Sequence, residues 1–271
     1  MTGAPSSLTL SDRVALVTGG SRGIGAGIAI ELARKGARVA ITYVSESSKA
    51  KAEDVVKQIT DIHKQYGVSS STPSAVAIQA DAESLDSPKK IVSEAVKALG
   101  NTIHILVNNA GVAGDQPVGE ITTELYDKIM NVNVRGVIFL TQEVLPHFPK
   151  NGGGKIVNIG SVSAITGYNG QTVYGASKAA IEGLTRVWAT ELGKSHGITV
   201  NTVNPGPVDT DMFNGVPPDA AQNILNSTPA KLGNRMASVK EISDIVTFLC
   251  EDRSSWVTGD IVSSNGGAVY R

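Results

Sequence analysis

Short runs of β-branched and aliphatic residues alternate with longer segments of helical periodicity along nearly the whole chain of 271 residues. Continuous apolar strands that alternate with helices are typical of a parallel sheet covered on both faces. The predicted strands span 13–19, 37–44, 74–81, 103–111, 154–161, 198–206 and 260–267, and the predicted helices span 23–36, 46–65, 88–99, 123–146, 172–194 and 238–250. We therefore expect residues 1–271 to form one doubly wound α/β domain around a seven-stranded parallel sheet.

Composition narrows the possible ligands of such a domain. The net charge is −1 and aromatic residues make up only 4%, which argues against a nucleic-acid surface. The four histidines show no metal-ligand spacing, so we expect no metal site. Cys250 is the only cysteine, which excludes an internal disulfide and fits a reducing compartment. With neither a signal peptide nor a membrane-length apolar run in the sequence, we expect a cytoplasmic protein with no membrane contact.

The glycine-rich segment TGGSRGIG at 18–25 follows the first predicted strand and opens the first predicted helix. Glycines permit a tight turn and close approach of a phosphate, and the helix N-terminus offers free N–H groups and a positive dipole end. At the first βα turn of a Rossmann-type pattern, this segment predicts dinucleotide binding. The residues expected to line it are Gly19, Ser21, Arg22, Gly23, Ile24 and Gly25.

The end of the second predicted strand indicates which dinucleotide is bound. NAD-binding proteins place an acidic residue there to bind both ribose hydroxyls, but Tyr43 and Ser45 occupy this region, and Glu46 follows slightly later. Arg22 reaches the same place from the glycine turn and offers a guanidinium to a 2′-phosphate. These features favour NADP(H) as the cofactor, and Glu46 is the feature that argues the other way.

Tyr174 and Lys178 stand four residues apart in a predicted helix, so both side chains lie on one face. An ammonium beside a phenol favours the phenolate, and we therefore expect the pKa of Tyr174 to fall below its usual value. Such a pair suits proton transfer, although the same spacing also occurs by chance on helix surfaces.

Five motifs together resemble the short-chain dehydrogenase/reductases over nearly the whole chain, and in particular the NADPH-preferring group of 3-oxoacyl carrier-protein reductases and fungal polyketide and naphthol reductases. They are TGGSRGIG at 18–25, NNAG at 108–111, Ser161 thirteen residues before the Tyr174–Lys178 pair, NPGPVDTDM at 204–212 and VTGDIVSSNGG at 257–267. The chain departs from the family at Asn265, where an aspartate is common.

The resemblance implies a role for each matching residue. Tyr174 would be the general acid, Lys178 would hold the nicotinamide ribose and lower the tyrosine pKa, and Ser161 would hydrogen-bond the substrate oxygen. Asn133 would hold a water that extends the proton relay. The remaining cofactor contacts would come from Asp81 and Ala82 beside the adenine, Asn109, Ala110 and Gly111 along the adenosine, and Pro205, Gly206, Val208 and Thr210 around the nicotinamide.

These features predict an NADPH-dependent carbonyl reductase acting on a small-molecule substrate. Two alternatives stay open: a dehydratase, epimerase or cyclase on the same scaffold, and a non-catalytic nucleotide-binding protein. The irregular segment 209–235 is expected to act as a substrate loop.

The predicted helices 123–146 and 172–194 carry apolar residues on more than one face, and only one face of each can cover the sheet. The residues concerned are Ile129, Val132, Val137, Leu140 and Val144 on the first and Ala180, Ile181, Leu184, Val187 and Trp188 on the second. Pairing of the second faces across two-fold axes predicts a homotetramer, with a dimer as the fallback.

Overall fold

The computed structural model describes residues 8–68, 71–215, 218–226 and 235–270. Its strands are β1 (Val14–Val17), β2 (Arg38–Tyr43), β3 (Ala75–Gln79), β4 (Ile105–Asn108), β5 (Lys155–Ile159), β6 (Thr199–Pro205) and β7 (Ile261–Ser264). Its helices are α1 (Gly23–Arg34), α2 (Lys49–Gln65), α3 (Ser87–Leu99), α4 (Thr123–Met130), α5 (Gly136–Val144), α6 (Thr172–His196), α7 (Asp211–Asn214), α8 (Pro218–Asn226) and α9 (Val239–Cys250). The order of strands and helices agrees with the sequence-based prediction, apart from boundaries and two segments.

The strands form one seven-stranded sheet in the order β3-β2-β1-β4-β5-β6-β7, and all neighbouring pairs are parallel. From β1 the chain moves outward to β3, then returns to place β4 on the other side of β1. The gap between β1 and β4 is therefore the topological switch point, where a doubly wound sheet opens a crevice for a ligand. The expected fold class is confirmed.

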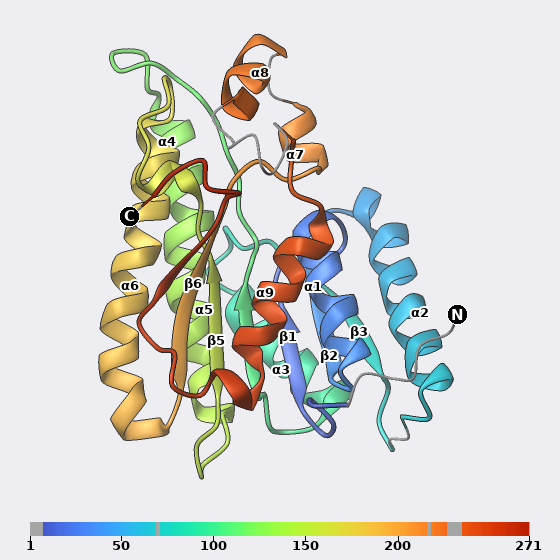
Figure 1. Ribbon diagram of the computed structural model, residues 1–271. Helices are drawn as coiled ribbons and strands as arrows, with labels where there is room; N and C mark the ends of the chain where they lie inside the picture. The colour runs from blue at the N-terminus through green and yellow to red at the C-terminus, as the bar shows by residue number, and fades with distance from the viewer. Residues whose placement is uncertain (1–7, 69–70, 216–217, 227–234, 271) are drawn as a thin grey trace.

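Helices cover both faces of the sheet (Figure 1). One apolar core lies between the sheet and α1, α2 and α9, with Ile28, Ile59 and Val246 among its buried residues. The other lies beneath α3, α5 and α6. Burial on both faces explains why the strands read as continuous apolar runs rather than as alternating ones.

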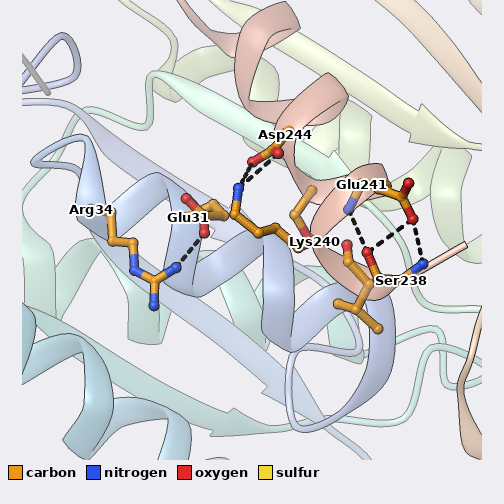
Figure 2. A network of polar contacts seen from close by, with 8 residues as sticks. Glu31, Arg34, Ser238, Lys240, Glu241 and Asp244 are labelled. Atoms are coloured by element: carbon orange, nitrogen blue, oxygen red, sulfur yellow. Dashed lines mark hydrogen bonds and ion pairs between the residues drawn. The ribbon is translucent and has the colours of Figure 1, made fainter.

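The helices α1 and α9 approach each other closely because Gly27 has no side chain. A Cβ at this position would lie 2.2 Å from Val239 Cγ1 and 2.7 Å from Ser243 Oγ. The same two helices carry ion pairs. On α9, Lys240 donates to both carboxylate oxygens of Asp244 at 2.7 Å, and on α1, Arg34 pairs with Glu31. Figure 2 shows these pairs beside the capping box of Ser238 and Glu241 that begins α9.

Two segments differ from the prediction. The helix expected over 123–146 is interrupted by a π-helical turn at Asn131–Arg135, which separates α4 from α5. The segment 209–235, expected as an irregular loop, contains α7 and α8 beyond the carboxyl edge of the sheet (Figure 1), and its residues 216–217 and 227–234 lie outside the described part of the chain. Within the described residues, we find no helix that is both long enough and apolar enough to cross a membrane.

Candidate active site

At the switch point, hydrogen bonds join the residues that follow β1 to those that follow β4. The buried hydroxyl of Thr18 accepts hydrogen bonds from the backbone N–H groups of Asn109 at 3.0 Å and Ala110 at 2.9 Å. The Asn109 side chain donates in return to the carbonyl oxygens of Thr18, at 2.8 Å, and Gly19, at 3.2 Å. The predicted adenosine residues and the glycine turn therefore form one rigid unit.

The glycine turn has the local geometry of a phosphate cradle. Gly19 and Gly23 have φ of 65° and 56°, a region that favours glycine. A Cβ on Gly25 would lie 2.3 Å from the Gly19 carbonyl oxygen, so the turn could not close around a larger residue. Arg22 precedes α1 without capping it through its side chain, so the first N–H groups of α1 remain available to an anion. This arrangement fits the pyrophosphate of a dinucleotide.

Hydroxyl groups and cations surround the end of β2. Thr42 on β2 accepts from the Gly19 N–H at 3.0 Å, which joins the strand to the glycine turn. The Ser45 hydroxyl lies 2.8 Å from that of Ser47 and 3.1 Å from that of Ser48. Arg22 forms an ion pair with Asp211 at the start of α7, with 2.9 Å between Nη1 and Oδ2. Tyr43 ends β2 and Ser45 follows it, so both predicted cofactor residues stand next to polar groups that suit a phosphate.

The π-turn places Asn133 inside the molecule, where it is buried. Its Oδ1 accepts from the Val112 N–H and its Nδ2 donates to the Val112 carbonyl, both at 2.9 Å. The same Nδ2 donates to the Ser177 hydroxyl at 3.1 Å. Ser177 in turn donates to the Tyr174 carbonyl at 2.7 Å. Asn133 therefore connects the segment after β4 to α6, and π-turns of this kind are frequent at functional sites.

Lys178 is buried and donates to the carbonyl oxygen of Ile159, at the end of β5, at 2.8 Å. Burial lowers the pKa of its ammonium to about 8, because a charge is costly away from water. A Cβ on Gly111 would lie 3.5 Å from Lys178 Nζ and 3.3 Å from Asn133 Oδ1. Gly111 thus leaves space beside both polar groups, at the place where the resemblance puts the cofactor.

Tyr174 lies one turn before Lys178 in α6, and Lys178 Nζ is 5.8 Å from the centre of its ring. The expected fall in the pKa of Tyr174 is wrong for this structure. Burial raises the pKa of the phenol above its usual value, and a hydrogen bond with the Ser161 side chain offsets only part of that rise. The ammonium contacts the ring and a backbone carbonyl, so it does not stabilise the phenolate as the sequence spacing suggested.

Ser161 follows β5 and is held from two sides. Its hydroxyl accepts from the Ser163 N–H at 3.1 Å, and its own N–H donates to Asn204 Oδ1 at 3.1 Å. Asn204 in turn donates to the buried Glu182 at 2.7 Å. Sequence reasoning missed these two partners. The NPG motif held a signal for Asn204, because it marks the end of β6, but nothing near Glu182 in the sequence points to the site.

The segment after β6 borders the site from the other side. The Ala237 N–H donates to the Pro207 carbonyl at 2.8 Å, and the Ala237 carbonyl accepts from the Asp209 N–H at 3.0 Å. These two bonds form a β-bridge opposite Val208 and do not use the backbone N–H and carbonyl of Val208. A Cβ on Gly23 would lie 3.4 Å from the Thr210 methyl, so Thr210 faces the glycine turn. Pro205 ends β6, and a Cβ on Gly206 would lie 3.0 Å from Cα of Asn265.

Asp81 and Ala82 follow β3 at the same edge of the sheet. Asp81 is exposed and accepts from the Glu83 N–H at 2.9 Å, which orders the turn after the strand. Gly136 packs against the Ala82 carbonyl, where a Cβ would lie 2.6 Å from the oxygen. Apart from Asn133, which lies in the π-turn between α4 and α5, the predicted site residues belong to the carboxyl edge or to the start of the helix that follows it. Within the described ranges, no three His, Cys, Asp or Glu residues are grouped so that they could hold a metal ion.

Comparisons with known proteins agree with this geometry. A family model described as Enoyl-(Acyl carrier protein) reductase matches residues 19–269. The chain is 45% identical over 266 residues to the short-chain dehydrogenase/reductase FrzI from Cladobotryum sp, covering 96% of this chain and 97% of that protein. It is 36% identical over 266 residues to the chloroplastic NADPH-dependent aldehyde reductase 2 of Arabidopsis thaliana, covering 97% and 96% of the two chains.

A solved structure shares the fold over the same length. The blue fluorescent protein from a metagenomic library, crystallised in complex with NADPH, superposes with a TM-score of 0.86 at 38% identity, covering 97% of this chain and 100% of that one. Sequence similarity of this extent, together with the shared fold, assigns the family directly. The chain belongs to the short-chain dehydrogenase/reductase family of oxidoreductases.

Proposed function

We propose that this oxidoreductase reduces the carbonyl group of a small-molecule ketone or aldehyde with NADPH, using Tyr174 as general acid. The observation that carries the proposal is the placement of four polar side chains near the carboxyl edge: Asn133, Ser161, Tyr174 and Lys178. The Ser161 side chain acts on the phenol of Tyr174 and offsets part of the rise in its pKa that burial causes, and the Lys178 ammonium lies 5.8 Å from the centre of the Tyr174 ring. Asn133 is joined to the same helix through Ser177.

The cofactor is NADP(H), as in the NADPH-dependent reductase and the NADPH complex among the related proteins. The glycine turn and the free N-terminus of α1 fit its pyrophosphate, and the hydroxyls and cations beyond β2 fit its 2′-phosphate. When bound, the cofactor supplies the hydride that adds to the carbonyl carbon. The protein supplies position and a proton.

Each polar residue of the site has a part in that proton transfer. The raised pKa of Tyr174 keeps the phenol protonated at neutral pH, so it can donate to the carbonyl oxygen as negative charge develops there. Ser161, whose backbone is fixed by Asn204, orients the same oxygen. Lys178 donates to the Ile159 carbonyl and Asn133 to Ser177, and we propose that these two side chains take part in replacing the proton.

The substrate is expected to enter beside α7, in the described part of the expected substrate loop at 209–235. The start of α7 carries Met212, which is exposed, and Phe213, which is partly exposed, beside Thr210. These apolar side chains would cover a hydrophobic carbonyl compound. One of the two relatives is named for aldehydes and the other for no substrate, so the proposal extends to the carbonyl class and not to one compound.

The test is the oxidation of NADPH by the purified protein with a panel of aldehydes, ketones, quinones and β-ketoacyl thioesters. We expect turnover with at least one carbonyl class and none without substrate. Tight NADPH binding with no oxidation by any of them would instead support the non-catalytic alternative. Conversion of a substrate without net consumption of NADPH would support a dehydratase, epimerase or cyclase.

We further propose that the chain assembles as a homotetramer. The structure corrects part of the sequence-based reasoning, because Ile129, Val132, Val137, Leu140 and Val144 are all buried within the protomer. Apolar exposure remains on the same helices at Tyr126, Phe139 and Val187, with exposed fractions of 49%, 41% and 52%. In the C-terminal part of the chain, Trp256 and Tyr270 are exposed by 98% and 80%. Apolar exposure both on α4, α5 and α6 and in the C-terminal part supports two two-fold interfaces.

The proposed location is a reducing compartment such as the cytoplasm. Cys250 is a buried free thiol within α9, and burial raises its pKa well above the usual value, so it stays protonated and unreactive. The chain contains no second cysteine that could form a disulfide with it.

A further inference from the structure

Two cations from different parts of the chain converge on a single carboxylate oxygen. Arg22 Nη1, in the glycine turn, lies 2.9 Å from Oδ2 of Asp211 at the start of α7. Lys51 Nζ, in the first turn of α2, lies 3.8 Å from the same oxygen. The pairing joins the cofactor turn, the helix after β2 and the proposed substrate segment.

This cluster stands where the 2′-phosphate of NADPH is expected. The phosphate lies beyond the carboxyl end of β2, and the Ser45, Ser47 and Ser48 hydroxyls gather there, immediately before α2. Lys51 follows this serine group within the first turn of α2. Sequence reasoning assigned Arg22 to the phosphate but did not include Lys51.

A phosphate and the Asp211 carboxylate would compete for the same two cations. A phosphate monoester carries a charge of about −1.5 to −2 near neutral pH and presents three acceptor oxygens, whereas a carboxylate carries one charge. The side chains of Arg22, Lys51 and Asp211 are 61%, 57% and 62% exposed, so water screens their pairing and exchange of partners costs little. Arg22 and Lys51 can therefore turn from the carboxylate to the stronger anion.

We propose that Lys51 is a second binding residue for the 2′-phosphate of NADPH, and that Asp211 is an internal competitor that weakens this binding. The inference rests on the proposed function, since it takes NADPH as the cofactor. It follows that Asp211 lowers the preference for NADPH over NADH, and that loss of Lys51 lowers it further.

Equilibrium binding tests this without turnover. NADPH, NADH, 2′,5′-ADP and 5′-AMP would be titrated by calorimetry into the wild-type protein and into the variants Lys51→Ala, Asp211→Asn and Lys57→Ala. We expect Lys51→Ala to weaken NADPH and 2′,5′-ADP by about three- to tenfold, the range of an exposed charge contact, and to leave NADH and 5′-AMP unchanged. Asp211→Asn should strengthen the two phosphate-bearing ligands by about two- to fivefold.

Lys57→Ala is the matched control. Lys57 lies on the same helix and is 75% exposed, but it pairs with Asp61 at 3.0 Å, away from the cluster. Its removal should change none of the four affinities. The double variant Lys51→Ala/Asp211→Asn adds a further test, because competition requires the gain from Asp211→Asn to shrink when Lys51 is absent.

The inference would be overturned if Lys51→Ala or Asp211→Asn changed the affinities for NADPH and NADH by the same factor. It would also be overturned if these variants changed neither affinity. The NADH titration also shows whether a variant is folded and able to bind. A wild-type protein that binds NADH but not NADPH would contradict the proposed cofactor. Wild-type binding of NADPH with insensitive Lys51 and Asp211 variants would contradict the roles of both residues and leave the proposed cofactor unaffected.

Discussion

At the level of single residues, Tyr174 and Lys178 show how burial changes the meaning of a sequence spacing. Their separation of four places them on one helix face, but the Lys178 ammonium bonds the Ile159 carbonyl at 2.8 Å. Burial then raises the pKa of the phenol and lowers that of the ammonium to about 8. Desolvation is the main cause of both pKa shifts, and it cannot be inferred from the spacing of the two residues in the sequence.

Replacing Tyr174 by phenylalanine keeps the ring and removes the hydroxyl. If the phenol is the general acid, kcat for carbonyl reduction should fall by at least about 10²-fold, because a positioned proton donor contributes that much. NADPH affinity, measured by calorimetry on the same preparation, should persist. Near wild-type turnover in Tyr174→Phe would remove this residue from the mechanism.

The depressed pKa of Lys178 makes a prediction for stability. In the unfolded chain the lysine titrates near its ordinary value of 10.5, and in the folded chain near 8, so between these values the unfolded state binds more protons. The folded state therefore bears a penalty for the buried charge below pH 8, and this penalty disappears as the pH rises towards 10.5.

The comparison with Lys178→Met isolates this effect from other titrations. Methionine carries no charge, so the stability advantage of the variant over the wild type should be largest at about pH 7 and shrink by about pH 10. Urea unfolding at the two pH values measures the difference. If the difference in unfolding free energy between Lys178→Met and the wild type does not change with pH, the lysine is not desolvated as the structure indicates.

At the level of elements, two local features position the site. The π-turn at Asn131–Arg135 adds a residue to the helical repeat and directs Asn133 towards Ser177. Near the C-terminus, the Asn265 amide accepts from the Gly267 N–H at 2.9 Å and donates to the Val269 carbonyl at 3.0 Å. An ionised aspartate could accept but not donate, so the asparagine at this position adds a tie to the last residues.

The contact between α1 and α9 depends on Gly27. Gly27→Ala places a methyl group 2.2 Å from Val239 Cγ1, and relief of this overlap must separate the helices. We expect the free energy of unfolding to fall by about 1–3 kcal/mol, as in other overpacked cores, measured by urea denaturation.

Gly193→Ala provides the control for this variant. Gly193 lies in α6, and among the described residues nothing beyond its own stretch of helix backbone comes within 4 Å of the point that a Cβ would occupy. Alanine should therefore stabilise the helix by up to about 1 kcal/mol. Equal effects of the two substitutions would show that α1 and α9 are not in close contact.

At the level of the whole molecule, the sheet order brings distant segments to one edge. Residues after β1, β4, β5 and β6 meet there because parallel strands share their carboxyl ends, and Thr18 and Asn109 bond across a separation of 91 positions. Away from the strand ends, Tyr126, Phe139 and Val187 are exposed on α4, α5 and α6, and we expect assembly to bury them.

Sedimentation equilibrium at micromolar concentration checks the proposed assembly. We expect about four times the chain mass of 28.1 kDa for the wild type. Phe139→Asp should reduce this to about half, because a charge in an apolar interface cannot be paired or hydrated. Leu85→Asp changes an exposed leucine outside α4, α5 and α6 and should leave the mass unchanged. A wild-type species of only 28.1 kDa would refute the tetramer.

The sequence by itself determined the fold class, the order of elements and the positions of Gly19, Ser161, Tyr174 and Lys178 at strand and helix ends. Periodicity and glycine placement are local properties, and a doubly wound topology then leaves one edge for the ligand. Only the tertiary structure decided the pairing of Glu182 with Asn204, the π-turn, and the convergence of Arg22 and Lys51 on Asp211. The first two depend on side chains or backbone from remote segments meeting in the interior, where burial sets their energies. The third lies in water, and it depends on the fold bringing the glycine turn, α2 and α7 to the same place.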